Sequence, residues 1–358
     1  MATEIYLGRP PENIVNWIKE HYKPAFKLTD PLCFTAEEAG STIKMSKHRS
    51  PPTVYLETSY TGEEGSWSDF IVCTEDENGN SNNDGTVITL TNIGDKVYFR
   101  AKQDNQQFAI DGINGNRFVM TGKIAASGNI NTLLKADGSI LDLTINNVDR
   151  SYCYANMFSG CSSLTQAPEL PAMTLADSCY GGMFASCTSL TQASELPAMT
   201  LADSCYNSMF AGCTSLIKAP ELPAMTLADS CYGSMFDYCR SLTQAPELPA
   251  TTLAKSCYAG MFLTCSSLAQ APKLPATNLA DNCYSFMFTQ CKSPLTFSDK
   301  TFDEVVDLIQ NNNLLGMLIW LDPKNGEEIN PVEIICSDKT MLASFNENEN
   351  TWTLTEKQ

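Results

Sequence analysis

A 26-residue internal repeat in the middle of the chain is the feature that most constrains its fold. The unit reads S-C-Y-x-x-M-F-x-x-C-[ST]-S-L-T-Q-A-P-E-L-P-A-[MT]-T-L-A-D, with five complete copies and a sixth that loses the pattern after its second cysteine. A period of this length predicts that each copy forms one structural unit, and that stacked neighbours bury a shared core. The expected core columns are Cys153, Cys179, Cys205, Cys231, Cys257 and Cys283; Cys161, Cys187, Cys213, Cys239, Cys265 and Cys291; and Phe158, Phe184, Phe210, Phe236, Phe262 and Phe288.

Each copy contains two segments with different local patterns. The segment S-L-T-Q-A-P-E-L-P alternates apolar residues with polar or small ones, which predicts a short strand with one buried face. Pro168 and Pro171 of the first copy disfavour a long central strand, so the strand is expected to turn a corner after Leu170. The segment C-Y-x-x-M-F has no long helical period and predicts a single helical or 3₁₀-like turn on the opposite side of the coil.

The repeated cysteines are expected to be small hydrophobic core residues. Structural zinc sites use C-x₂₋₄-C pairs, whereas the spacing here is C-x₇-C and the chain's two histidines, His21 and His48, lie outside the repeat. A nucleophilic thiol needs a neighbouring base, and no histidine is near. Disulfides between adjacent coils are the remaining alternative, but a column of identical cysteines offers no unique partner and the total of 15 is odd. The pattern therefore favours free, buried thiols and predicts no metal and no cofactor.

The unit resembles the BspA-like, type-5 class of bacterial leucine-rich repeats, whose coil reads I-G-x-x-A-F-x-x-C-x-x-L-x-x-V-x-[IL]-P-x-x-[VL]. Cys179-Tyr180 takes the I-G place, Met183-Phe184 the A-F place, Cys187 the C place and Leu196-Pro197 the I-P place. The resemblance implies a right-handed solenoid with one parallel strand per coil. It also implies a protein that is displayed on a bacterial surface for adhesion and protein recognition.

The segments around the repeat predict a chain that is mainly β with short helices. Short β-branched and aromatic runs separated by polar turns predict an N-terminal β-sandwich, immunoglobulin-like in outline. The full expectation is this sandwich, then a right-handed leucine-rich-repeat solenoid of six 26-residue coils, then a C-terminal α+β cap. The expected divisions are residues 1–28 (a helical segment), 29–128 (the sandwich), 129–150 (a linker and N-terminal cap), 151–297 (the solenoid) and 298–358 (the C-terminal cap).

The two ends of the chain carry the helix signals. The stretch P-P-E-N-I-V-N-W-I-K-E-H-Y near the start predicts a helix, and residues 1–25 are a possible docking segment for a partner subunit. The stretch S-D-K-T-F-D-E-V-V-D-L-I-Q predicts a second helix with Ser298 or Asp299 near its cap. Strands are expected from V-E-I-I-C-S-D-K-T-M-L-A-S-F, folded at S-D-K-T, and from T-W-T-L-T-E-K.

Charge and hydropathy exclude several classes of partner. The chain has 41 acidic and 23 basic residues, a net charge of −18, and no basic patch, so nucleic acid and anionic membranes are not expected to bind. No apolar run approaches the length of a membrane span. The start of the chain lacks a basic segment followed by an apolar run, so no signal peptide is expected.

No catalytic signature is present, so we expect a non-enzymatic protein that binds a protein or a surface glycan. Positions that vary among the copies are the candidate contact residues, and the bulkiest occur in the later copies: Asp237, Tyr238, Arg240, Leu263 and Phe286. The leading hypothesis is adhesion at a bacterial cell surface or in the extracellular space. The first alternative is a structural or receptor-binding component of a phage tail, located in the virion. The second is a glycan-binding β-sandwich with the solenoid as spacer.

Overall fold

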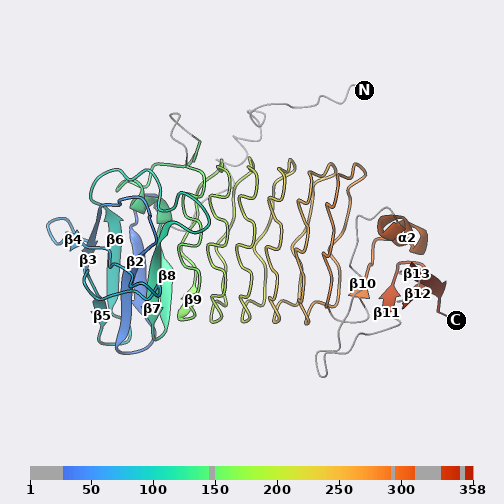
Figure 1. Cartoon of the computed structure of the whole chain (residues 1–358), viewed down its shortest axis with the longest axis horizontal. Coiled ribbons are helices and arrows are strands. Elements are labelled where there is room, and N and C mark those ends of the chain that lie inside the picture. The colour runs from blue at the N-terminus through green and yellow to red at the C-terminus, as the bar shows by residue number, and fades with distance from the viewer. Residues whose placement is uncertain (1–26, 145–149, 292–294, 311–331, 347–350, 358) are drawn as a thin grey trace.

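The computed structural model describes residues 27–144, 150–291, 295–310, 332–346 and 351–357, and the expected N-terminal helix lies outside them. The described part is mainly β, with several sheets and one short α-helix. Figure 1 shows sheets at one end, a row of stacked coils in the middle, and a small sheet with the helix at the other end. We number the coils from 1 to 6: coil 1 is residues 152–177, each later coil begins 26 residues further on, and coil 6 begins at residue 282.

Two sheets form the N-terminal part. One has six strands in the order β4-β3-β6-β1-β8-β9, and the other has three in the order β5-β2-β7. The run R-F-V-M-T-G-K-I is divided between two strands, because Gly122 adopts a φ of +79° between them. The bounds are β1 (Leu32–Ala36), β2 (Ser41–His48), β3 (Leu56–Ser59), β4 (Ser68–Phe70), β5 (Ile88–Leu90), β6 (Lys96–Ala101), β7 (Gly115–Thr121) and β8 (Ile124–Ser127).

The two N-terminal sheets share an aromatic core. Phe34 of β1 meets Phe99 of β6 edge to face at 5.4 Å between ring centroids, and it meets Phe118 of β7 at 5.1 Å. All three rings are buried, and the edge-to-face geometry is the one that aromatic quadrupoles favour. The first two strands belong to the larger sheet and β7 to the smaller, so these rings hold the sheets together. The immunoglobulin-like outline stays a prediction.

Successive coils stack their aromatic side chains in two parallel columns, one of tyrosines and one of phenylalanines (Figure 1 shows the row of coils). Neighbouring tyrosine rings lie 5.7–5.9 Å apart and neighbouring phenylalanine rings 5.4–5.9 Å apart, all within 9° of parallel. Every ring in both columns is at most 1% exposed. The spacing shows that each coil buries its side chains against equivalent side chains of its neighbours. The tyrosines are Tyr154, Tyr180, Tyr206, Tyr232, Tyr258 and Tyr284.

The C-Y-x-x-M-F segment was expected to form a single helical or 3₁₀-like turn, and it forms successive turns closed by hydrogen bonds of the 3₁₀ (i→i−3) kind. Its backbone N–H groups alternate between two kinds of acceptor, one within the coil and one in the next coil. The Ala155 N–H donates to the Tyr152 carbonyl at 2.8 Å, while the Tyr154 N–H donates to the Cys179 carbonyl of coil 2, also at 2.8 Å. A helix would keep all these bonds inside the segment. The segment is instead a series of turns that pairs with the next coil at every second residue.

This alternation depends on a left-handed backbone conformation at every fourth residue. Each coil has three such residues, with φ between +51° and +79°. Glycine, serine and asparagine occupy most of these places, because bulky residues pay a steric penalty there. The three columns are Tyr152, Ser178, Ser204, Ser230, Ser256 and Asn282; Asn156, Gly182, Ser208, Ser234, Gly260 and Phe286; and Gly160, Ser186, Gly212, Tyr238, Thr264 and Gln290.

The opposite side of each coil, which contains the prolines, pairs less than was expected. Among the described residues of coils 1–5, only coil 1 has a strand, β9 (Leu164–Gln166), which lies parallel to β8. Later coils have isolated bridges in its place, such as that between Lys218 and Gln244. The prediction of one strand per coil was therefore wrong, and the prolines give the reason. Proline has no backbone N–H, so each proline removes a hydrogen-bond donor that a strand of the next coil would need. Only one or two hydrogen bonds can then form between neighbouring coils on this side.

Both expected capping regions are in contact with the stack, but the N-terminal sheets contribute more than was expected. Phe108 extends the tyrosine column at 6.0 Å from Tyr154, and Phe118 extends the phenylalanine column at 5.1 Å from Phe158. The 129–150 segment adds a buried hydrogen bond, in which the Tyr154 hydroxyl donates to Asn131 at 2.9 Å. Asn131 lies in a 3₁₀ turn, η1 (Ile130–Leu133). The first coil is thus closed both by these rings and by the 129–150 segment, whose Ile130 and Leu143 N–H groups donate to the Glu169 and Thr174 carbonyls at 3.1 and 3.0 Å.

At the other end, β10 (Leu295–Thr296) joins coil 5 to a four-stranded sheet in the order β10-β11-β12-β13 (Figure 1). Phe297 ends the phenylalanine column by packing edge-on against Phe288 at 5.6 Å. The predicted helix and strands are present as α2 (Phe302–Gln310), β11 (Val332–Ile335), β12 (Thr340–Asn346) and β13 (Thr351–Glu356). Thr301, two residues after Asp299, is the N-cap of the helix: its N–H donates to Glu304 at 2.7 Å, which is one half of a capping box.

Candidate functional site

All 15 cysteines are buried thiols outside any disulfide, and the second cysteine of each coil also forms a hydrogen bond. The Cys187 thiol donates to the Phe158 carbonyl of the preceding coil at 3.1 Å, and this carbonyl also accepts the Cys161 N–H at 2.9 Å. The same thiol contact recurs from Cys161 to Cys291. Sequence reasoning had treated these residues as apolar only. A thiol suits the position because it fills the core and donates to a buried carbonyl.

Burial keeps these thiols protonated and unreactive. It raises the pKa of Cys161 and Cys213 to about 12. We therefore expect a thiol reagent at pH 8 to modify the folded chain slowly, and to modify 15 thiols per chain once guanidinium unfolds it without reductant. Absorbance of the released reagent counts the thiols. Fewer than 15 in the unreduced, unfolded sample would mean that some cysteines form disulfides.

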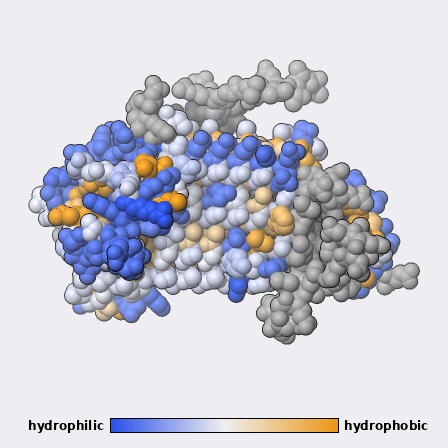
Figure 2. Space-filling model, viewed as in Figure 1, coloured by the Kyte–Doolittle hydropathy of each residue, from blue (hydrophilic) through white to orange (hydrophobic). Residues whose placement is uncertain are grey.

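We call residues 152–160 of coil 1 and the equivalent nine residues of coils 2–6 the turn face. Most of its outward side chains are small. Two large hydrophobic residues of this face are exposed, Tyr238 of coil 4 and Phe286 of coil 6. Figure 2 shows one side of the stack, where side chains of intermediate hydropathy prevail and hydrophobic ones gather over the coils near the C-terminal sheet. An exposed apolar group on an otherwise bland, regular surface is a candidate contact site.

Two aromatic residues on the turn face occupy backbone positions that do not suit them. Tyr238 and Phe286 have φ of +59° and +56°, at places where other copies have glycine, serine or asparagine in most cases. A bulky residue in this conformation costs roughly 1–2 kcal/mol. Both side chains are also exposed, at 46% and 44%. Neither strain nor exposure benefits the fold, and strained residues of this kind concentrate at functional sites.

The predicted contact residues lie on coils 4–6, and the structure brings two of them into direct contact. The Arg240 guanidinium lies 5.4 Å from the centre of the Tyr238 ring, within cation–π range. Leu263 of coil 5 is half-buried, at the position equivalent to Asp237 of coil 4. Tyr238, Leu263 and Phe286 are thus residues of the turn face on coils 4, 5 and 6, and Arg240 follows this face two residues later on coil 4.

Asp237 of coil 4 is half-buried, and its equivalents in the neighbouring coils, Ala211 and Leu263, are apolar. One of its carboxylate oxygens is buried without a hydrogen-bond partner in the described part of the chain. Burial raises the pKa of Asp237 to about 6, and a hydrogen bond from the Tyr238 backbone N–H only partly offsets the rise. Asp237 is therefore a poor contact residue and a source of instability at neutral pH, unlike its four predicted companions.

We expect the Asp237→Asn variant to be more stable than the wild-type chain at pH 7.5, by about 1 kcal/mol once solvent screening at this half-exposed site is allowed for. An acid whose pKa rises on folding holds its proton more tightly in the folded chain, so stability falls as the pH rises from about 4 to above 6. The difference should vanish at pH 4. Urea unfolding at both pH values measures it, and Asp281→Asn, at an exposed carboxylate, is the control that should show no such pH dependence.

The described residues contain no group of three or more histidine, cysteine or acidic side chains that could hold a metal ion. No helix in the described part of the chain is both long and apolar enough to cross a membrane. Comparisons with protein-family models, with curated proteins and with solved structures find no match for the chain.

Proposed function

We propose that this chain is a non-enzymatic binding protein, and that its stacked coils form a solenoid of the leucine-rich-repeat kind whose turn face recognises a protein partner. The observation that carries the proposal is the pair of strained, exposed aromatic residues, Tyr238 and Phe286. Tyrosine and arginine are among the residues most enriched in protein interface hot spots, and Arg240 lies over the Tyr238 ring. The bacterial-surface location implied by the repeat resemblance belongs to the same proposal.

The rest of the molecule suits a rigid display of this face. The core of coils 4–6 consists of the tyrosine and phenylalanine columns, in which every ring is at most 1% exposed. Contact residues on such a support lose little conformational entropy on binding, because their backbone is already ordered. The small residues of coils 2 and 3 on the same face leave space for a partner broader than the contact patch.

The test uses an array of purified extracellular and cell-surface proteins, probed with the full-length chain and with the double variant Tyr238→Ser/Phe286→Ser. Serine occurs at the Tyr238 position in coil 2 (Ser186) and at the Phe286 position in coils 3 and 4 (Ser208 and Ser234), so the variant should keep its stability within about 1 kcal/mol. We expect proteins that bind the wild-type chain to bind the double variant at least about tenfold more weakly.

The matched control is Tyr60→Ser, which removes an aromatic side chain that is 65% exposed just after β3. It should leave binding unchanged. Equal binding by the wild type and the double variant, or the same loss with Tyr60→Ser, would contradict recognition by the turn face.

A further inference from the structure

Pairing on the proline side of the coils is interrupted at the junction between coils 2 and 3. Coil 1 pairs with coil 2 there: the Thr191 N–H donates to the Thr165 carbonyl at 3.0 Å. Coil 3 pairs with coil 4, through Thr243 and Ile217 at 3.3 Å. Between residues 190–202 and 216–228, all of which are described, no backbone hydrogen bond or β-bridge forms. Along this side, the backbone donors and acceptors of coils 2 and 3 therefore do not pair with each other, although each coil pairs with its other neighbour.

The sequence departs from the repeat at the same junction. Ser194 replaces a proline, Lys218 replaces a glutamine, and Ile217 replaces a residue that is threonine in three other copies. The Ser194 hydroxyl donates to the Pro168 carbonyl of coil 1, so this substitution ties coil 2 to coil 1. Coil 2 is thus bonded on one side and open on the side that faces coil 3.

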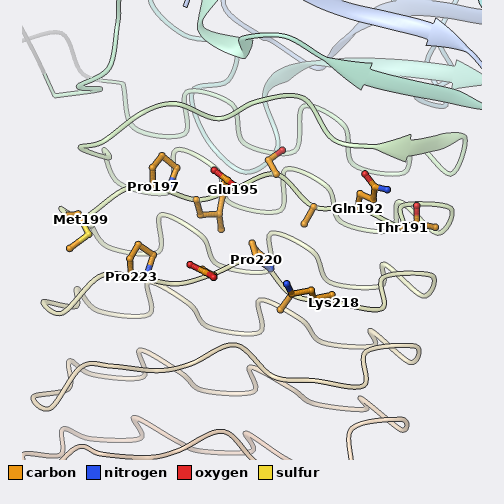
Figure 3. Close-up of a pocket in the computed structure, with 13 residues that line it drawn as sticks. Thr191, Gln192, Glu195, Pro197, Met199, Lys218, Pro220 and Pro223 are labelled. Carbon is orange, nitrogen blue, oxygen red and sulfur yellow. The ribbon is translucent and has the colours of Figure 1, made fainter. Parts of the chain in front are cut away.

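A groove of about 570 Å³ lies over this open junction (Figure 3). Its size falls within the range of small-ligand sites, roughly 300–1,000 Å³. Exposed polar side chains from both coils line it, together with proline rings and a methionine. None of its charged residues forms an ion pair within the described chain. The groove residues used below are Gln192, Glu195 and Met199 of coil 2, and Lys218, Glu221 and Pro223 of coil 3.

The hydrogen-bonding groups that line the groove indicate the class of ligand that it can bind. Glu195 and Glu221 accept hydrogen bonds, and Lys218 and Gln192 donate them. The groove has two carboxylates and one ammonium, which disfavours an anionic ligand, and the described residues that line it include no aromatic side chain to anchor a hydrophobic group. Hydroxyl groups are both donors and acceptors, so a neutral polyol can satisfy every one of these groups. The proline and methionine surfaces can cover the C–H face of such a ligand.

We propose that the groove between coils 2 and 3 binds a neutral oligosaccharide segment, with Glu195 and Glu221 accepting from its hydroxyls and Lys218 and Gln192 donating to them. This site lies across the core from the turn face and does not depend on it. The proposal therefore stands or falls separately from recognition of a protein by Tyr238 and Phe286.

The experiment is isothermal titration calorimetry of the full-length chain with cellohexaose, maltohexaose and chitohexaose. We expect at least one hexasaccharide to bind, and Glu195→Ala and Lys218→Ala each to weaken that binding at least about tenfold, since each removes a charged hydrogen-bonding partner. The matched controls are Glu247→Ala and Gln244→Ala, the equivalent positions in coil 4, outside the groove. They should leave the affinity unchanged, as should Tyr238→Ser/Phe286→Ser.

Three results would overturn the proposal. The first is the absence of binding heat with all three hexasaccharides. The second is an equal loss of affinity in the coil 4 controls, which would point to the repeated polar rows and not to the groove. The third is binding of heparin or poly-lysine with no binding of the neutral sugars, which would indicate a purely electrostatic surface.

Discussion

Replacing Phe210 by alanine is expected to lower the free energy of unfolding by about 3–5 kcal/mol. Phe210 is fully buried in the middle of its column, at 5.5 Å from Phe184 and 5.8 Å from Phe236. The truncation removes two ring stackings and leaves a cavity that the coils on either side cannot close, because their own hydrogen bonds fix the spacing. Urea unfolding followed by circular dichroism measures the loss.

The control for this variant is Phe286→Ala, because it makes the same chemical change in the same repeated segment. Phe286 is 44% exposed, so its loss should change stability by less than about 1 kcal/mol. Similar losses in the two variants would mean that the column does not carry the stability of the stack.

Replacing Phe118 by alanine is expected to cost a similar amount, about 3–5 kcal/mol, and also to change how the chain unfolds. Phe118 of β7 is 1% exposed and contacts both the N-terminal sheets and the coils. Its ring lies 5.1 Å from that of Phe34 in the sheets, and it stacks on Phe158 of coil 1, also at 5.1 Å. Stacked repeats are stabilised chiefly by nearest neighbours, so loss of this ring weakens one interface selectively. A single unfolding transition should then split into two, seen by calorimetry.

Phe70→Ala is the matched control for the coupling. Phe70 is 5% exposed and packs on Phe99 at 5.0 Å in the same sheets, with no ring contact to the coils. It should lower the stability of the N-terminal sheets. The sheets and the coils should still unfold in a single transition, as in the wild type. If Phe70→Ala splits the transition as much as Phe118→Ala does, the junction has no special role.

Much of the molecule could be predicted because its signals are local. The alternation of residues in the runs around Phe34 and Phe99 marks strands wherever they occur, and the amphipathic pattern before Gln310 marks the C-terminal helix. The twelve repeated cysteines and six phenylalanines were expected in the core, and all are buried. Side-chain type and spacing are enough to predict such features, because the burial of apolar surface depends on the local pattern of apolar residues.

The candidate site was only partly predictable. Comparison of the copies singled out Tyr238, Leu263 and Phe286 as unusual, but it did not show that two of them sit on a strained backbone. Frequent glycine, serine and asparagine at every fourth residue was an available signal for that conformation. The groove was missed, although Ser194 and Lys218 interrupt the repeat and mark its place.

The 26-residue period alone accounts for a stack of equivalent coils with cysteine and aromatic columns inside it, because each copy is too small to bury its own apolar residues. It does not predict which residues of different coils come into contact when the coils stack. The thiol of Cys187 and the carbonyl of Phe158, Phe118 and the first coil, and the open junction beside Lys218 all depend on which backbone groups meet across coils. Tertiary packing decides these pairings, since hydrogen bonds and ring contacts require distances that spacing along the chain does not specify.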